Sequence, residues 1–125
     1  MIPYATYKLV HLFGILLTFV MLGALTLHAA TGAAKSTNPM RRPVTALHGV
    51  GAFLILLGGF GMLARLGVMH GSGFPGWLWV KIGVWVLVAI LVILPYRKPS
   101  LARPMLFVLP VLGALAAYMA IYKPL

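Results

Sequence analysis

Five side chains able to bind a metal ion, a proton or an anion stand inside or beside the apolar runs of this sequence. They are His11, His28, His48, His70 and Lys81. An imidazole ring binds transition metals and titrates near neutral pH, whereas a lysine ammonium holds anions. Ionisable side chains at membrane depth are costly, and they mark functional sites by default. What these five can do depends on whether the helices that carry them bring them to a common depth.

Acidic and cysteine side chains are absent from all 125 residues, while Lys and Arg together number ten. Without a side-chain carboxylate, the chain cannot carry out paired-acid glycoside hydrolysis or two-metal phosphoryl transfer, and it cannot form a carboxylate calcium site. A proton pump built on a membrane Asp or Glu is excluded as well. Without cysteine there is no disulfide, thiolate nucleophile or iron–sulfur cluster. Chemistry based on histidine and lysine is therefore what remains.

The composition is that of a membrane protein. Hydrophobic residues make up 62% of the chain and charged residues 8%, against about 25% charged in soluble domains. A membrane helix needs roughly 20 apolar residues, and a backbone in lipid must satisfy its own hydrogen bonds. We predict helices over about 4–30, 44–66, 76–96 and 104–122. The predicted fold class is all-α, an integral membrane up-and-down four-helix bundle that forms one transmembrane domain over residues 1–125. The first run is longer than a signal-peptide core, which favours a retained helix.

The basic residues separate the apolar runs instead of forming one face. This pattern is typical of loops against anionic lipid headgroups and does not indicate nucleic-acid binding. Six lie in the predicted first and third connections: Lys35, Arg41, Arg42, Arg97, Lys98 and Arg103. Three lie on the opposite side: Lys8, Arg65 and Lys123. The positive-inside rule then predicts both connections in the cytoplasm and both termini outside.

Counting residues from the predicted span ends sorts the candidate side chains by depth. His11 and Lys81 lie roughly 10 Å and roughly 7 Å from the outer ends of their helices, at 1.5 Å per residue. His70 follows the second helix on that same side. His28 and His48 lie near the inner ends of the first and second helices. We therefore expect an outer layer and an inner layer.

Two histidine layers are the arrangement that b-type haem requires, because the iron takes axial imidazoles from facing helices at similar depth. His28 and His48 would form one axial set. His11, together with His70, would form the outer set or face a substrate, and Lys81 would hold an anion such as a haem propionate. The alternative is that the histidines are structural and that Lys81 extends to the membrane interface.

Glycines and methionines allow two other interpretations. Five glycines of the second predicted helix permit close helix approach or leave room for a flat cofactor: Gly49, Gly51, Gly58, Gly59 and Gly61. Such a face would also suit a non-catalytic scaffold that assembles with partners. Met69 and His70 are adjacent, and thioether and imidazole ligands suit Cu(I), so copper handling is a further alternative. No Met-x-x-Met cluster accompanies them, and copper therefore ranks below haem.

The order of several short motifs resembles a known family. Lys8-Leu-Val-His11 opens the first span, and His48 lies early in the second. Gly76-Trp-Leu-Trp-Val-Lys81 opens the third span, and Tyr118-Met-Ala-Ile-Tyr-Lys-Pro closes the fourth. Over nearly its whole length the chain resembles the SirB-like family of small four-span bacterial membrane proteins. More distantly, it is similar to CopD-type and HemJ-type proteins.

The resemblance implies the bacterial cytoplasmic (inner) membrane as the location. HemJ-type proteins are haem-binding protoporphyrinogen oxidases in which a first-span histidine and a third-span lysine matter, and His11 and Lys81 match those positions. CopD-type proteins are linked to copper. The chain departs from HemJ in lacking carboxylates, which argues against the oxidase activity. His28 and His48 have no counterpart there, and they suit electron transfer better.

These features predict a small cytochrome-like membrane protein that binds haem b and transfers electrons, with a quinone, a porphyrin or another membrane redox protein as partner. If the chain is an enzyme, we expect a membrane oxidoreductase. The scaffold and copper interpretations stay open as alternatives. So does assembly into a homo-oligomer.

Overall fold

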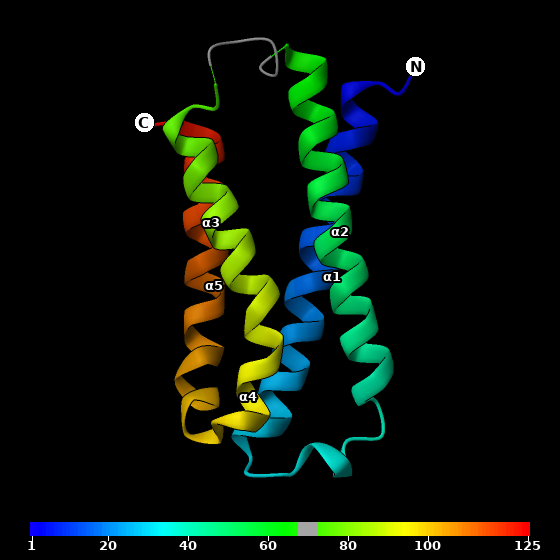
Figure 1. Cartoon of the computed structure of the whole chain (residues 1–125), viewed down its shortest axis with the longest axis vertical. Helices are drawn as coiled ribbons and strands as arrows, with labels where there is room; N and C mark the ends of the chain where they lie inside the picture. The colour runs from blue at the N-terminus through cyan, green and yellow to red at the C-terminus, as the bar shows by residue number, and fades with distance from the viewer. Residues whose placement is uncertain (68–72) are drawn as a thin grey trace.

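The computed structural model describes residues 1–67 and 73–125, and within these ranges the chain is helical without strands. Figure 1 shows long helices running side by side along one axis: α1 (Tyr4–Ala30), α2 (Arg41–Leu66), α3 (Gly76–Ile90) and α5 (Pro99–Tyr122). A 3-10 turn, η3 (Leu91–Ile93), and a short helix, α4 (Leu94–Arg97), extend α3. Another 3-10 turn, η1 (Lys35–Thr37), lies in the first connection. The predicted all-α class is confirmed.

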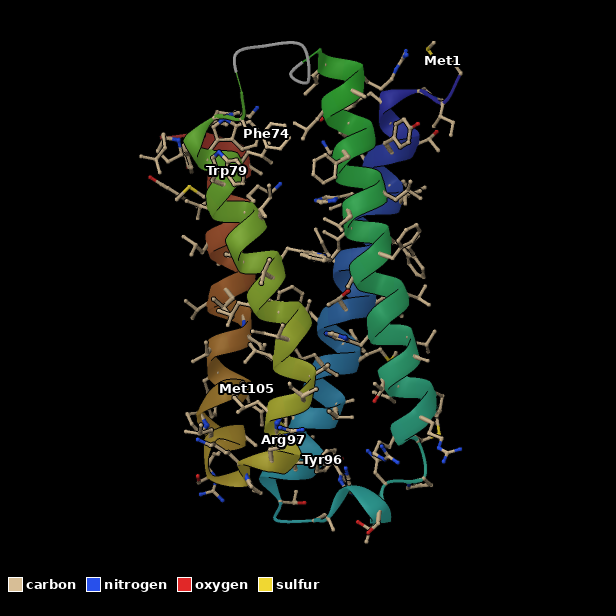
Figure 2. The ribbon with its side chains drawn as sticks, in the orientation of Figure 1. Met1, Phe74, Trp79, Tyr96, Arg97 and Met105 are labelled. Carbon is tan, nitrogen blue, oxygen red and sulfur yellow. The ribbon has the colours of Figure 1, made fainter. Side chains whose placement is uncertain are left out.

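Four helical segments are long and apolar enough to cross a membrane, as a multi-pass membrane protein requires. They are Tyr4–Ala30, Arg41–Leu66, Gly76–Arg97 and Pro99–Tyr122. Both termini lie at one end of the bundle, here called the terminal end, and the first and third connections lie at the other, the basic end (Figure 1). Figure 2 shows Phe74 and Trp79 at the terminal end and Tyr96 and Arg97 at the basic end. Aromatic side chains at both ends are typical of membrane interfaces.

Helices α1 and α2 touch through glycine. A Cβ built on Gly14 of α1 would lie 2.7 Å from the backbone nitrogen of Ile55, and one on Gly58 of α2 would lie 2.6 Å from the carbonyl oxygen of Tyr7. A Cβ on Gly51 would collide with Thr18. Only glycine allows two backbones to come this close, which is how membrane helices gain van der Waals contact without a hydrophobic driving force. The pair is the most extensive helix contact in the described chain.

The buried core joins α1 to α3 and α5 instead of lying between all four helices equally. Its buried members are Leu22, Val84, Val88, Met105 and Leu109. Helices α2 and α3, by contrast, make few contacts. The bundle is therefore a tight α1–α2 pair and an α3–α5 pair that meet mainly through α1.

Helix ends differ from the predicted ones at prolines and basic residues. Helix α2 begins at Arg41 instead of 44, and α5 begins at Pro99 instead of 104. Proline fits the first helical turn because its missing N–H would have no partner there. In the third span, Pro95 cannot donate to the Leu91 carbonyl four residues back, and the Leu94 N–H bonds to that carbonyl instead. The helix tightens there into η3.

Candidate functional site

His11 projects from α1 against α2 and is fixed by a hydrogen bond. Its Nδ1 lies 2.8 Å from the carbonyl oxygen of Ile55, and its ring lies so close to Gly59 that an added Cβ would stand 3.4 Å from Nδ1. A carbonyl oxygen only accepts, so Nδ1 carries the proton and donates it. The other nitrogen, Nε2, then keeps its lone pair. Metal-binding histidines are oriented in this way by a backbone carbonyl.

Lys81 lies at the depth of His11. Two hydrogen bonds fix α3 against α2: Trp85 Nε1 donates to the Ala52 carbonyl at 2.9 Å, and His48 Nε2 donates to the Val88 carbonyl at 3.2 Å. Counting along the antiparallel helices from these bonds puts Lys81 level with Ile55 and Leu56. Lys81 is half-buried, and so is the His11 ring. The structure thus places the first-span histidine and the third-span lysine at a similar depth.

His48 is the most deeply buried of the three described histidines, with 3% of its surface exposed. Because Nε2 donates to the Val88 carbonyl, Nδ1 is the nitrogen with the lone pair. Binding iron through Nε2 would require this bond to break. The ring is arranged as a proton or hydrogen-bond acceptor through Nδ1.

His28 belongs to a hydrogen-bonded cluster at the basic end. Asn38 Nδ2 donates to the Tyr96 hydroxyl at 3.0 Å, and that hydroxyl lies 2.7 Å from His28 Nδ1. Thr37 Oγ1 donates its proton to the Ala34 carbonyl and lies 3.5 Å from His28 Nε2, so Nε2 carries the imidazole proton and the Tyr96 hydroxyl donates to Nδ1. The rings of His28 and Tyr96 also meet edge to face at 5.7 Å. The cluster ties the end of α1 to the first connection and to α4.

The structure does not bring His28 and His48 together. The α1–α2 contacts, with His11 opposite Gly58 and Thr18 opposite Gly51, put His28 about level with Arg41, the first residue of α2. His48 therefore stands about seven residues deeper, roughly 10 Å at 1.5 Å per residue. Each ring also bonds to a different partner. The two histidines of the expected inner axial set thus lie in two separate environments.

His70 and Met69 lie outside the described residues, so the outer set with His70 and the copper interpretation have no structural counterpart here. Within residues 1–67 and 73–125, no three metal-binding side chains of the His, Cys, Asp and Glu types come together. A haem needs only one or two imidazoles from the chain. The described residues therefore offer enough imidazole ligands for haem, but no three-residue site for a bare metal ion.

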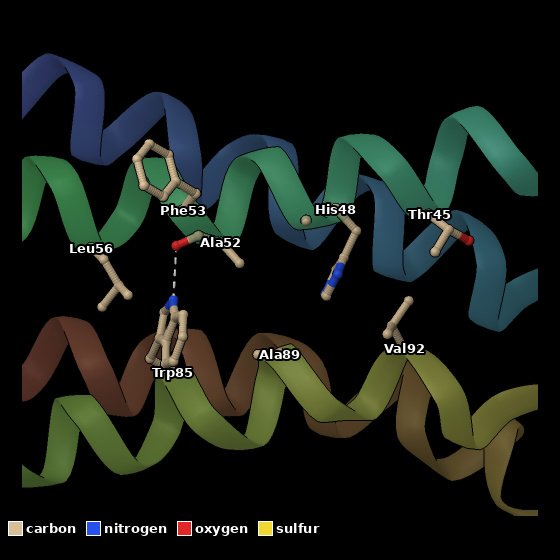
Figure 3. Close-up of a pocket in the computed structure, with 9 residues that line it drawn as sticks. Thr45, His48, Ala52, Phe53, Leu56, Trp85, Ala89 and Val92 are labelled. Atoms are coloured by element: carbon tan, nitrogen blue, oxygen red, sulfur yellow. Dashed lines mark hydrogen bonds between the residues drawn. The ribbon is translucent and has the colours of Figure 1, made fainter.

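A groove separates α2 from α3 beside His48. It has a volume of about 470 Å³ and is lined by Thr45, His48, Gly49, Ala52, Phe53, Leu56, Trp85, Ala89 and Val92. Figure 3 shows His48 directed from α2 toward α3, with the Trp85 indole bonded to Ala52 farther along. The sequence analysis missed Trp85. Its mid-span position, four residues after Lys81, could have singled it out, because interfacial tryptophans stand at helix ends.

No protein-family model, curated protein or solved structure matches the chain. The resemblance to the SirB-like family stays a prediction.

Proposed function

We propose that this chain is a small membrane protein that binds b-type haem and transfers electrons, with His11 as the axial ligand. The observation that carries the proposal is the hydrogen bond from His11 Nδ1 to the Ile55 carbonyl. It directs Nε2, with its lone pair, away from α2. Lys81 stands at the same depth as this nitrogen, as a partner for the group that His11 binds.

The residues at this depth fit the charge of haem as well as its iron. Lys81 has no acidic side chain anywhere in the chain as a counter-ion, so an anion bound beside it must come from outside the side chains. A propionate would supply that charge, and a charge-assisted hydrogen bond to Lys81 would hold it. When bound, haem supplies one-electron redox chemistry. His11 would bind and orient the group, and the apolar helices around it would exclude water.

Optical spectra of the detergent-purified protein test this assignment. With ample haem supply, we expect a Soret band that sharpens on reduction and is lost in His11→Ala. His48→Ala serves as the matched control, because it also removes a buried imidazole, but at another depth in the membrane. We expect this variant to keep the Soret band. Lys81→Met should lower haem occupancy by about tenfold, the loss of one charge-assisted hydrogen bond. A colourless wild-type protein, or a band lost only in His48→Ala, would contradict the proposal.

We further propose that the basic end faces the cytoplasm of a bacterium and contacts anionic headgroups, with both termini outside. Six basic residues in the first and third connections support this orientation. Cysteine labelling tests the orientation, and because the sequence has no cysteine, an introduced cysteine carries the sole thiol. In intact cells, a membrane-impermeant maleimide should label Leu125→Cys and spare Ser36→Cys. The reverse labelling would overturn the orientation.

A further inference from the structure

The groove between α2 and α3 is a second place where chemistry can occur, away from His11 and Lys81. Helix α2 meets α3 there through two side-chain hydrogen bonds, Trp85 to Ala52 and His48 to Val88, instead of close packing. In between, Gly49 has no atom within 4 Å of an added Cβ. The space beside Gly49 is therefore not filled by neighbouring side chains.

The groove opens to the side, toward lipid. Phe53 is 62% exposed, and Thr45 and Gly49 are exposed as well. In a membrane-spanning helix these surfaces face hydrocarbon, so a ligand would enter from the bilayer and must itself be apolar. The volume of about 470 Å³ lies within the roughly 300–1,000 Å³ common for small-molecule sites.

The polar chemistry of the groove comes chiefly from one acceptor. His48 is 3% exposed, and its Nε2 is committed to Val88, so Nδ1 offers a lone pair. Within the described ranges no hydrogen bond to Nδ1 is found. The indole N–H of Trp85 is likewise committed to Ala52, which leaves its ring as flat apolar surface. A matching ligand is a flat, apolar ring that carries a hydroxyl.

We propose that this groove binds the ring of a membrane quinol, with one quinol hydroxyl donating to Nδ1 of His48. The quinol meets all three requirements: it dissolves in the bilayer, its flat ring matches the apolar face of Trp85, and its O–H is a donor. The quinone form has carbonyl oxygens only, and it cannot donate to Nδ1. The site therefore prefers the reduced form. The inference does not depend on haem, because neither His11 nor Lys81 lines the groove.

Binding is measured on haem-free protein in nanodiscs, as the saturable retention of a radiolabelled short-chain benzoquinol or benzoquinone above that of empty nanodiscs. In Gly49→Leu we expect quinol affinity to fall about tenfold or more, because the new side chain occupies the groove and its Cβ meets no other atom. Gly83→Leu is the matched control: Gly83 also has nothing within 4 Å of its Cβ position and does not line the groove. We expect it to bind normally.

His48→Leu tests the hydrogen bond. It should weaken quinol binding about tenfold and quinone binding much less, since only the quinol donates to Nδ1. A Trp77→Phe/Trp79→Phe background leaves Trp85 as the sole tryptophan, and saturable quenching of its fluorescence by benzoquinone would place the ring in the groove.

Several results would overturn the proposal. They are an absence of saturable binding, a Gly49→Leu protein that binds like wild type, or equal losses in Gly49→Leu and Gly83→Leu. Equal losses of quinol and quinone in His48→Leu would remove the assigned hydrogen bond. A Gly49→Leu protein that loses a dimer seen in wild type would reassign the groove to a second copy of the chain. A haem spectrum that depends on His48 would reassign it to a porphyrin.

Discussion

The two faces of α2 use the same residue type in opposite ways. Toward α1, Gly51 and Gly58 let two backbones come into contact, and no atom larger than hydrogen fits. Toward α3, Gly49 has open space beside it and lines a groove of about 470 Å³. A glycine in a membrane helix therefore does not by itself indicate close helix packing. Its role depends on whether a neighbouring backbone lies against it. The α1–α2 face is built for rigidity, and the α2–α3 face is built around a space.

The largest expected effect comes from filling the closed face. Gly14→Leu should destabilise the protein by about 3 kcal/mol, because its Cβ alone would meet the Ile55 nitrogen at 2.7 Å and the Gly51 carbonyl at 2.8 Å, and backbone cannot move aside. Thermal or denaturant unfolding in detergent measures the loss. Gly23→Leu on the same helix has nothing within 4 Å, and it should unfold nearly like wild type. Equal stability of the two variants would contradict the contrast between the faces.

A smaller effect is expected from cutting one of the two bonds across the open face. Trp85→Phe removes the indole donor to Ala52 and should lower the free energy of unfolding by about 1 kcal/mol, the usual worth of such a bond between membrane helices. Trp79→Phe makes the same chemical change on a side chain that is 59% exposed, and it provides the control. If both substitutions cost the same, the bond to Ala52 does not hold α3 against α2.

An effect of similar size and opposite sign is expected from a buried hydroxyl within the closed face. Thr18 and Thr26 both lie fully buried on α1. Thr26 donates to the Leu22 carbonyl at 2.6 Å, whereas Thr18 Oγ1 has no partner among the described residues. Thr18→Val should raise the free energy of unfolding by about 1 kcal/mol, since it removes an unsatisfied polar atom and keeps the shape. Thr26→Val should leave stability unchanged or lower it. A gain of the same size in both variants would show that the hydrogen bond of Thr26 is irrelevant.

The sequence predicted the helices well because apolar length alone determines a membrane span. The first helix spans residues 4–30 both in the prediction and in the structure. Errors arose where charge was taken as the end of a helix. Arg41 and Arg42 are helical, although they were assigned to a loop, because a membrane helix can continue past the hydrocarbon into the headgroup region.

That error in one helix end explains the misplaced depth of His48. Starting α2 at 44 put His48 near the membrane interface and beside His28. Starting it at Arg41 moves His48 three residues deeper, about 4.5 Å, toward the middle of the span. The predicted depths of His11 and Lys81 are unaffected, because they are counted from the first residues of α1 and α3, which the sequence predicted correctly. Hydrogen-bond partners such as the Ile55 and Val88 carbonyls lie on other helices, and no periodicity within one helix can reveal them.

The 3-10 turn before Pro95 also sets a rotation. Each of its three residues turns the chain by about 120° instead of the α-helical 100°, so the helix beyond it is rotated by about 60° relative to an uninterrupted one. Tyr96 is the first aromatic residue after that rotation, and it reaches His28 at 2.7 Å. Pro95, which is fully buried and makes no polar contact of its own, thus acts as an angular spacer. It sets the rotation at which the third span presents Tyr96 to His28 of the first span.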